Sequence, residues 1–92
     1  MITIFTPTYN RADSLLKLKE SLDSQIDKRF EWIIVDDGSI DKTKAMVSEW
    51  LNNDLGYEIR YIYQINQGKP SAFNVGVKNS KGKYFICVDS DD

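Results

Sequence analysis

Three carboxylates stand within the last four residues of the chain, directly after an apolar run. The run is "FICV" at 85–88, and Asp89, Asp91 and Asp92 follow it. Like charges this close repel one another unless a cation lies among them. Mg²⁺ and Mn²⁺ prefer such oxygen ligands and need only one or two carboxylates where substrate phosphates complete the coordination. An acidic turn after an edge strand is the simpler alternative, but the apolar run is typical of a buried central strand. We therefore expect a divalent cation that bridges this cluster to a diphosphate.

A second acidic pair follows another apolar run, in "VDDGS" at 35–39. Gly38 and Ser39 are explained by a turn that leads into a helix, with Ser39 able to cap the helix start. A turn does not explain why Asp36 and Asp37 stand together directly after a buried strand. Acidic residues at this place in other nucleotide-binding α/β folds accept hydrogen bonds from a ribose or a base. The pair therefore favours a nucleotide contact.

Two further polar segments could take part in the same site. In "TPTYN" at 6–10, an exposed Tyr9 ring would offer a stacking face to a base. Tyr9 could equally cover a core edge, and Asn10 could cap the following helix. In "NQGKPS" at 66–71, Gly68 and Lys69 precede a helix start, where backbone N–H groups and a positive charge suit a phosphate. A solvated lysine in a turn remains the alternative there.

Hydrophobic periodicity predicts strands that alternate with helices. Continuous apolar residues at 32–35 indicate a strand buried on both faces, and we expect Pro7 to end the first strand because proline cannot donate in mid-ladder. Leu15, Leu18, Leu22 and Ile26 form one helical stripe; Met46, Val47, Trp50 and Leu51 form another, whose helix Ser39 or Asp41 would cap. The expected strands are 2–6, 31–37, 57–65 and 83–88. The expected helices are 11–26, 41–54 and a third that starts at 69 and has Gly82 after its end.

This order predicts an α/β fold, a Rossmann-like three-layer α/β/α arrangement with a mostly parallel sheet. In such folds ligands bind at the carboxyl ends of the strands. Each of the four polar segments follows one of the four strands, so we expect all of them at one rim of the sheet. We expect the fourth strand near the sheet centre, with one edge left open where the downstream part of the domain is absent.

Composition is that of an ordinary globular chain. The 92 residues carry a net charge of −2 and no basic excess, which argues against a nucleic-acid partner. The single Cys87 lies in an apolar run and reads as a reduced core cysteine. No signal peptide or membrane-spanning run is recognisable. We expect a cytoplasmic protein, with any membrane association supplied by regions outside this sequence.

Taken together, the motifs resemble the family 2 glycosyltransferases, which have the GT-A fold. The matching segments are "TPTYNR", "VDDGSID", "NQGKPSAFNVGVKNSKGKYF" and "VDSDD", in the family's order and approximate spacing over nearly all of the chain. The resemblance implies an enzyme that transfers a sugar from a nucleotide-activated donor, often a UDP-sugar, to an acceptor hydroxyl. It also implies Mn²⁺ or Mg²⁺ as cofactor, held by a DXD motif.

By position, the resemblance implies a nucleotide-binding set and a metal-binding pair. It places Tyr9 against the base, Asp36 or Asp37 in contact with the base, and Asp89 at the ribose. The nucleotide-binding set is Pro7, Tyr9, Asp36, Asp37, Lys69 and Asp89, and the metal ligands are Asp91 and Asp92. Many members read "ARN" where this chain has Ala72, Phe73 and Asn74. Any donor contact made by that arginine is therefore absent here, unless Lys69 or Lys78 substitutes for it.

Family members continue well beyond the DXD motif. The resemblance therefore implies that residues 1–92 are the donor-binding part of a GT-A domain, truncated after that motif. The general base and the pocket for an acceptor glycan or lipid-linked glycan would lie beyond it, so no catalytic residue is assigned here. We expect this part alone to bind donor without transferring sugar, and its open sheet edge to favour self-association.

Three other classes are compatible with parts of the pattern. A sugar nucleotidyltransferase would need a glycine-rich basic loop after the first strand, and "TPTYNR" has no glycine. A phosphoacceptor signalling domain usually has its acidic pair after the first strand, whereas the pairs here follow the second and fourth. A non-catalytic nucleotide-binding module is the strongest alternative.

Overall fold

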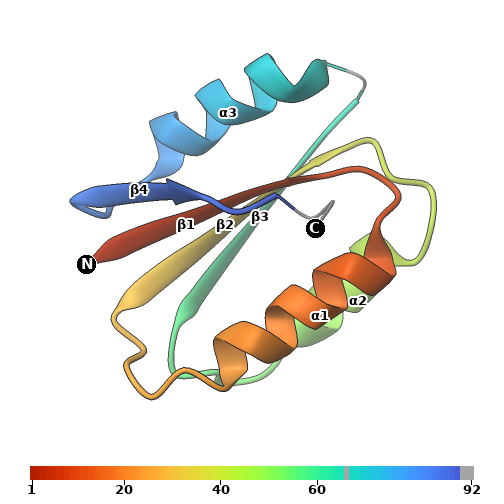
Figure 1. Ribbon diagram of the computed structural model, residues 1–92. Helices are drawn as coiled ribbons and strands as arrows, with labels where there is room; N and C mark the ends of the chain where they lie inside the picture. The colour runs from red at the N-terminus through yellow and green to blue at the C-terminus, as the bar shows by residue number, and fades with distance from the viewer. Residues whose placement is uncertain (66, 90–92) are drawn as a thin grey trace.

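The computed structural model describes residues 1–65 and 67–89 and confirms the predicted α/β fold. The described residues form four parallel strands in the order β3-β2-β1-β4, with three helices in the crossovers (Figure 1). The elements are β1 (Ile2–Thr8), α1 (Ala12–Asp23), β2 (Phe30–Asp37), α2 (Thr43–Trp50), β3 (Glu58–Gln64), α3 (Gly68–Asn79) and β4 (Tyr84–Cys87). No helix in this part of the chain is long and apolar enough to cross a membrane.

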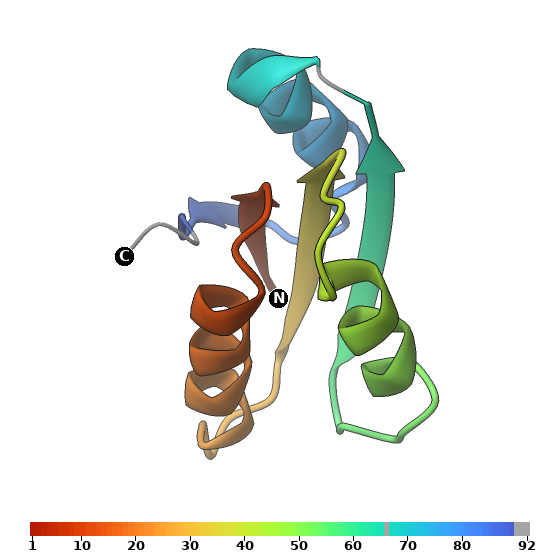
Figure 2. The same ribbon diagram turned by 90° about the vertical axis from the view of Figure 1, so that its right-hand side faces the viewer.

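Helices cover both faces of the sheet, which gives the expected three layers. Figure 2 shows α1 and α2 on one face and α3 on the other. Successive strand residues point to opposite faces, so the apolar run of β2 supplies both cores. The core beneath α1 and α2 contains Leu15, Leu22, Phe30, Trp32, Ile34, Val47 and Ile59; the core beneath α3 contains Phe5, Ile33, Val35 and Ala72.

The register brings the carboxyl ends of the first three strands level with one another. β1 pairs with β2 as far as Thr8 opposite Asp36, and β2 pairs with β3 so that Asp36 lies opposite Tyr63. Thr8, Asp36 and Tyr63 therefore lie side by side across the sheet. The loops that follow these strands must start from the same edge.

Pro7 does not end β1, contrary to our expectation. In a parallel ladder a residue directs its N–H and C=O to the same neighbour, and alternate residues face the same side. The Phe5 carbonyl accepts the Val88 N–H at 2.8 Å, so Phe5 and Pro7 face the β4 side. The paired part of β4 ends opposite Phe5. The strand therefore continues through Pro7, because the N–H that proline lacks falls beyond that pairing.

The central position expected for β4 belongs to the longer domain, and the described part of residues 1–92 shows the open edge expected without the downstream part. Among the described residues, β4 pairs only with β1 and forms one edge of the sheet. Tyr84 and Ile86 are 61% and 46% exposed, and Cys87 is exposed rather than a core residue. Phe85 alone packs against the core beneath α3. The apolar sequence around Cys87 was misleading, because burial of a strand residue also depends on what pairs with the second edge of its strand.

Helices α1 and α2 end earlier than the hydrophobic stripes suggest. Ile26 is fully exposed and Leu51 is 48% exposed, so neither belongs to the core. The end of α1 at Asp23 leaves carbonyl groups without partners in the helix, and other side chains donate to them. Lys28 Nζ donates to the Leu22 and Asp23 carbonyl oxygens, and Ser24 Oγ donates to the Ser21 carbonyl.

A buried glutamate organises the end of the sheet opposite the candidate site. Glu31 is 1% exposed and accepts hydrogen bonds from Thr3 Oγ1 and the Arg60 guanidinium. It also accepts the backbone N–H groups of Lys81 and Gly82, which ties the α3–β4 turn to the sheet. Burial raises the pKa of Glu31, but the bonds from Thr3, Lys81 and Arg60 outweigh it and lower the pKa below its ordinary value.

Candidate functional site

Three of the four predicted polar segments follow β1, β2 and β3, whose carboxyl ends lie at the same end of the sheet. In Figure 1 the loops after β1, β2 and β3 leave the sheet at the same end. Tyr9 follows β1, Asp36 and Asp37 close β2, and Asp89 follows β4. Asp91 and Asp92 lie outside the described residues, as does the side chain of Lys69. The described part contains no group of three His, Cys, Asp or Glu side chains that could hold a metal.

Asp36 is fully buried and fixes the β2–α2 loop through hydrogen bonds. Its side chain is 0% exposed. Oδ1 accepts the Ser39 N–H at 2.9 Å, and Oδ2 accepts the Tyr61 hydroxyl from β3. Burial, and then the hydrogen bond to Asp36, raise the pKa of Tyr61, so this hydroxyl stays protonated and keeps donating. Because both oxygens are engaged inside the protein, Asp36 acts on the rim by shaping its loop.

Asp37 is half-buried and connects β2 to the start of α3. Its Oδ1 accepts the Gln67 N–H at 2.7 Å, and its Oδ2 accepts the Gly68 N–H at 2.9 Å. Gln64 Nε2 donates to Oδ1 at 3.2 Å. Burial raises the pKa of Asp37, but the two backbone N–H groups and Gln64 outweigh it, and the pKa is lowered. The carboxylate therefore stays charged at the N-terminus of α3, where a negative charge is favoured.

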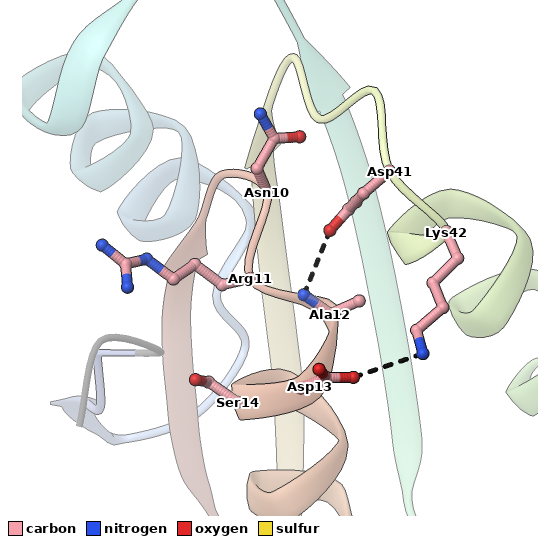
Figure 3. Close-up of a pocket in the computed structure, with 7 residues that line it drawn as sticks. All are labelled: Asn10, Arg11, Ala12, Asp13, Ser14, Asp41 and Lys42. Atoms are coloured by element: carbon pink, nitrogen blue, oxygen red, sulfur yellow. Dashed lines mark hydrogen bonds and ion pairs between the residues drawn. The ribbon is translucent and has the colours of Figure 1, made fainter.

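The loops after β1 and β2 are locked together by hydrogen bonds. The Asn10 N–H donates to Ser39 Oγ at 2.7 Å, and the Ile40 N–H donates to Asn10 Oδ1 at 2.8 Å. The Ala12 N–H donates to Asp41 Oδ2 at 3.3 Å (Figure 3). Asn10 therefore bridges two loops and does not cap α1, because α1 takes its cap from the neighbouring loop.

Asp41, rather than Ser39, accepts hydrogen bonds from the first residue of α2. Its Oδ1 accepts the Thr43 N–H at 3.0 Å and the Thr43 hydroxyl at 2.6 Å. With Ala12 on its other oxygen, one carboxylate holds the first turns of α1 and α2. These turns border an open pocket of about 470 Å³, lined by residues 10–14, Asp41 and Lys42 (Figure 3). The Lys42–Asp13 ion pair at 3.2 Å is exposed and contributes little to stability.

The remaining predicted site residues differ in their exposure. Tyr9 is 51% exposed, so its ring is accessible to a ligand. Pro7 is buried and Asp89 is half-buried. Sequence reasoning missed the bridge from Asn10 to Ser39 because both residue types suit local helix caps, and their contact spans 29 positions of sequence.

Comparison with known proteins decides the family. The model of the glycosyl transferase family 2 domain matches residues 3–92. The chain belongs to glycosyl transferase family 2. A glycosyltransferase from Rickettsia prowazekii is 38% identical over 92 residues, which cover all of this chain and 27% of that protein. Glycosyltransferase GlyA from Streptococcus pneumoniae is 37% identical over 91 residues, covering 99% of this chain and 13% of GlyA.

Solved glycosyltransferase structures have the same fold as this family 2 chain. S. aureus TarS 1–349 in complex with UDP superimposes with a TM-score of 0.81 at 29% identity, covering 98% of this chain and 27% of TarS. Mannosyltransferase PcManGT from Pyrobaculum calidifontis, in complex with GDP-Man and Mn²⁺, superimposes with a TM-score of 0.86 at 24% identity, covering 98% and 27%. At that identity the second likeness concerns the fold alone. The chain thus spans about a quarter or less of these proteins.

Proposed function

We propose that residues 1–92 are the donor-binding part of a family 2 glycosyltransferase and bind a nucleoside-diphosphate sugar at the strand-end rim. One observation carries the proposal: the fold matches that of TarS, solved with UDP and with UDP-GlcNAc, at 29% identity over 98% of this chain. This likeness favours a UDP-sugar as donor. The cluster of exposed aromatic, carboxylate and amide groups at the same rim supports the location.

The geometry divides the proposed nucleotide contacts by accessibility. The exposed ring of Tyr9 is available to stack on the base. Of the two candidates for an acidic base contact, Asp37 is half-exposed and Asp36 is not, which favours Asp37. Asp89 contacts the ribose, while the buried Pro7 supports the rim from below. We assign Lys69 to the phosphates, since the backbone of Lys69 lies in the first turn of α3.

We assign the divalent metal to Asp91 and Asp92. The support is chemical: aspartate oxygens are the donors that Mg²⁺ and Mn²⁺ prefer. Such an ion would neutralise charge on the departing nucleoside diphosphate. Asp89, beside this pair in sequence, brings the ribose contact next to the metal.

The whole protein, on this proposal, transfers the donor sugar to a hydroxyl of a glycan or lipid-linked glycan in the cytoplasm. The general base that deprotonates this hydroxyl lies outside residues 1–92, so the chain alone binds donor and transfers nothing. The rival function is a nucleotide-binding module without catalysis. Family membership favours the enzyme, and sugar transfer by the full-length protein separates the two.

Calorimetric titration with UDP, in the presence and absence of Mn²⁺, tests the proposal. We expect binding that requires the metal and is lost in Asp91→Ala. Asp54→Ala is the matched control, because Asp54 lies in the α2–β3 loop at the opposite end of the sheet. GDP and dTDP titrations test the base preference. Failure of a folded chain to bind any of these nucleotides, or equal binding by Asp91→Ala, contradicts the proposal.

A further inference from the structure

Asn10 has a backbone conformation that residues other than glycine rarely adopt. Its φ is +50°, and it is the sole non-glycine with positive φ in the described part of the chain. The left-handed region is unfavourable for L-residues, although asparagine tolerates it better than most. Such conformations persist where surrounding contacts fix them, and they concentrate at ligand-binding sites.

The contacts that fix Asn10 come from the opposite loop. Its N–H donates to Ser39 Oγ at 2.7 Å, and its Oδ1 accepts the Ile40 N–H at 2.8 Å. One residue thus uses a backbone donor and a side-chain acceptor toward two consecutive residues. This two-way bridge sets the direction of the chain as well as its position.

Ser39, which accepts the hydrogen bond from the Asn10 N–H, is itself hydrogen-bonded to residues of the sheet. Its N–H donates to buried Asp36 at 2.9 Å, and its carbonyl accepts the Tyr63 hydroxyl at 3.3 Å. Asp36 belongs to β2 and Tyr63 to β3. The bridge therefore connects the loop after β1 to the ends of two neighbouring strands.

Tyr9 directly precedes Asn10 in the chain, and the Tyr9 residue is 51% exposed. Residue 10 thus fixes the backbone from which the Tyr9 ring projects. We propose that Asn10 is a positioning residue, which holds Tyr9 where its ring meets the base without touching the nucleotide itself. This inference rests on the proposed function, in which Tyr9 stacks on the base.

Three substitutions separate the two properties of Asn10. Asn10→Asp keeps the oxygen acceptor and a tolerance of positive φ; Asn10→Gly keeps only the conformation; Asn10→Ala loses both. Asn52→Ala is the matched control, because Asn52 is an exposed residue just after the end of α2. If the side-chain oxygen makes the bridge, Asn10→Asp should keep the hydrogen bond from the Ile40 N–H and Asn10→Gly should lose it.

Amide hydrogen exchange tests the bridge without any ligand. The loss of one hydrogen bond accelerates exchange of the Ile40 amide about tenfold. We expect this acceleration in Asn10→Ala and Asn10→Gly, and near-wild-type exchange in Asn10→Asp and Asn52→Ala. Unchanged Ile40 exchange in Asn10→Ala would overturn the bridge and the inference with it.

Titrations with UDP and with pyrophosphate, both with Mn²⁺, test the link to the base. We expect Asn10→Ala to lower the affinity for UDP about tenfold. The affinity for pyrophosphate should stay unchanged, since pyrophosphate has no base. In a Tyr9→Ala background, Asn10→Ala should cause no further loss. Equal losses for both ligands, or full additivity with Tyr9→Ala, would overturn the positioning role. A wild-type chain that binds no UDP would overturn the proposed function, and this role with it, while Ile40 exchange would still report the bridge.

Discussion

Two adjacent carboxylates at the end of β2 have different tasks, and their burial explains why. Asp36 points into the protein and has both oxygens bonded to Ser39 and Tyr61. Asp37 points toward the β3–α3 loop and holds the Gln67 and Gly68 N–H groups. The period-two alternation of a strand sends neighbours to opposite faces. One acidic pair can therefore brace two different loops of the rim.

Asp37→Asn tests the hold on α3. The asparagine side chain has an NH2 group in place of one carboxylate oxygen, and NH2 cannot accept a hydrogen bond from a backbone N–H. One of the two bonds to the start of α3 is therefore lost, and we expect a loss of about 1–2 kcal/mol in the free energy of unfolding. Chemical denaturation measures this loss. Asp13→Asn is the control, because Asp13 is 87% exposed and its ion pair contributes little. Equal stability of the two variants would show that Asp37 does not hold the helix.

The same carboxylate predicts a pH dependence. The pKa of Asp37 is lowered in the folded protein. Its contribution is therefore complete above the ordinary aspartate pKa of 3.8 and is lost as the pH falls through the folded pKa. We expect the stability difference between wild type and Asp37→Asn to shrink below about pH 4. A difference that grows on acidification would contradict this sign.

Glu31→Gln tests the buried anchor at the other end of the sheet. Removing the charge leaves the Arg60 guanidinium, whose side chain is 24% exposed, without its buried partner. We expect a loss of about 3 kcal/mol in the free energy of unfolding. Glu58→Gln is a close control, since Glu58 contacts the same arginine at 3.4 Å but is 48% exposed. Losses of equal size would remove burial as the cause.

At the scale of elements, α3 lies close to β1 because a glycine leaves room. A Cβ at Gly76 would lie 2.4 Å from Phe5 Cδ1. The Phe5 ring is confined by Phe73 and Phe85, with centroids 5.9 and 5.5 Å away. Gly76 thus allows the close distance between α3 and the sheet.

Gly76→Ala should therefore destabilise the protein despite the better helix propensity of alanine. Overpacking costs about 1–3 kcal/mol and the propensity gain is about 1 kcal/mol, so we expect a net loss of about 1 kcal/mol. Thermal or chemical unfolding measures it. Asn74→Ala, at an exposed position of the same helix, should cause no loss. A stabilised Gly76→Ala would mean that α3 moves away from the sheet freely.

The elements also show what sequence patterns could predict. The order of strands and helices, the buried run of β2 and the placement of Tyr9, Asp36 and Asp37 at one edge followed from local periodicity and parallel connections. The exposure of Cys87 did not, because the run at 85–88 is as apolar as a buried strand. Nor did the Asn10–Ser39 bridge, which depends on a contact between loops distant in sequence.

At the scale of residues 1–92 as a whole, the edge of β4 that no other described strand pairs with predicts self-association of this chain. Unpaired strand edges with exposed apolar side chains tend to pair with other chains, and a charge on the edge opposes this. Ile86, 46% exposed on β4, is the position to change. We expect Ile86→Lys to reduce association in sedimentation velocity. Ile26→Lys, which changes a fully exposed isoleucine away from the edge, should leave association unchanged; the reverse pattern would rule out the β4 edge.

The central claim is that a nucleoside diphosphate binds at the carboxyl ends of the strands. The most direct measurement is an amide NMR titration of this chain with UDP and Mg²⁺. We predict that the largest shifts fall at residues 9–10, 37–39, 67–69 and 89–92. Shifts centred on Glu31, Lys81 and Gly82 at the opposite end, or none in a folded chain, would contradict the claim.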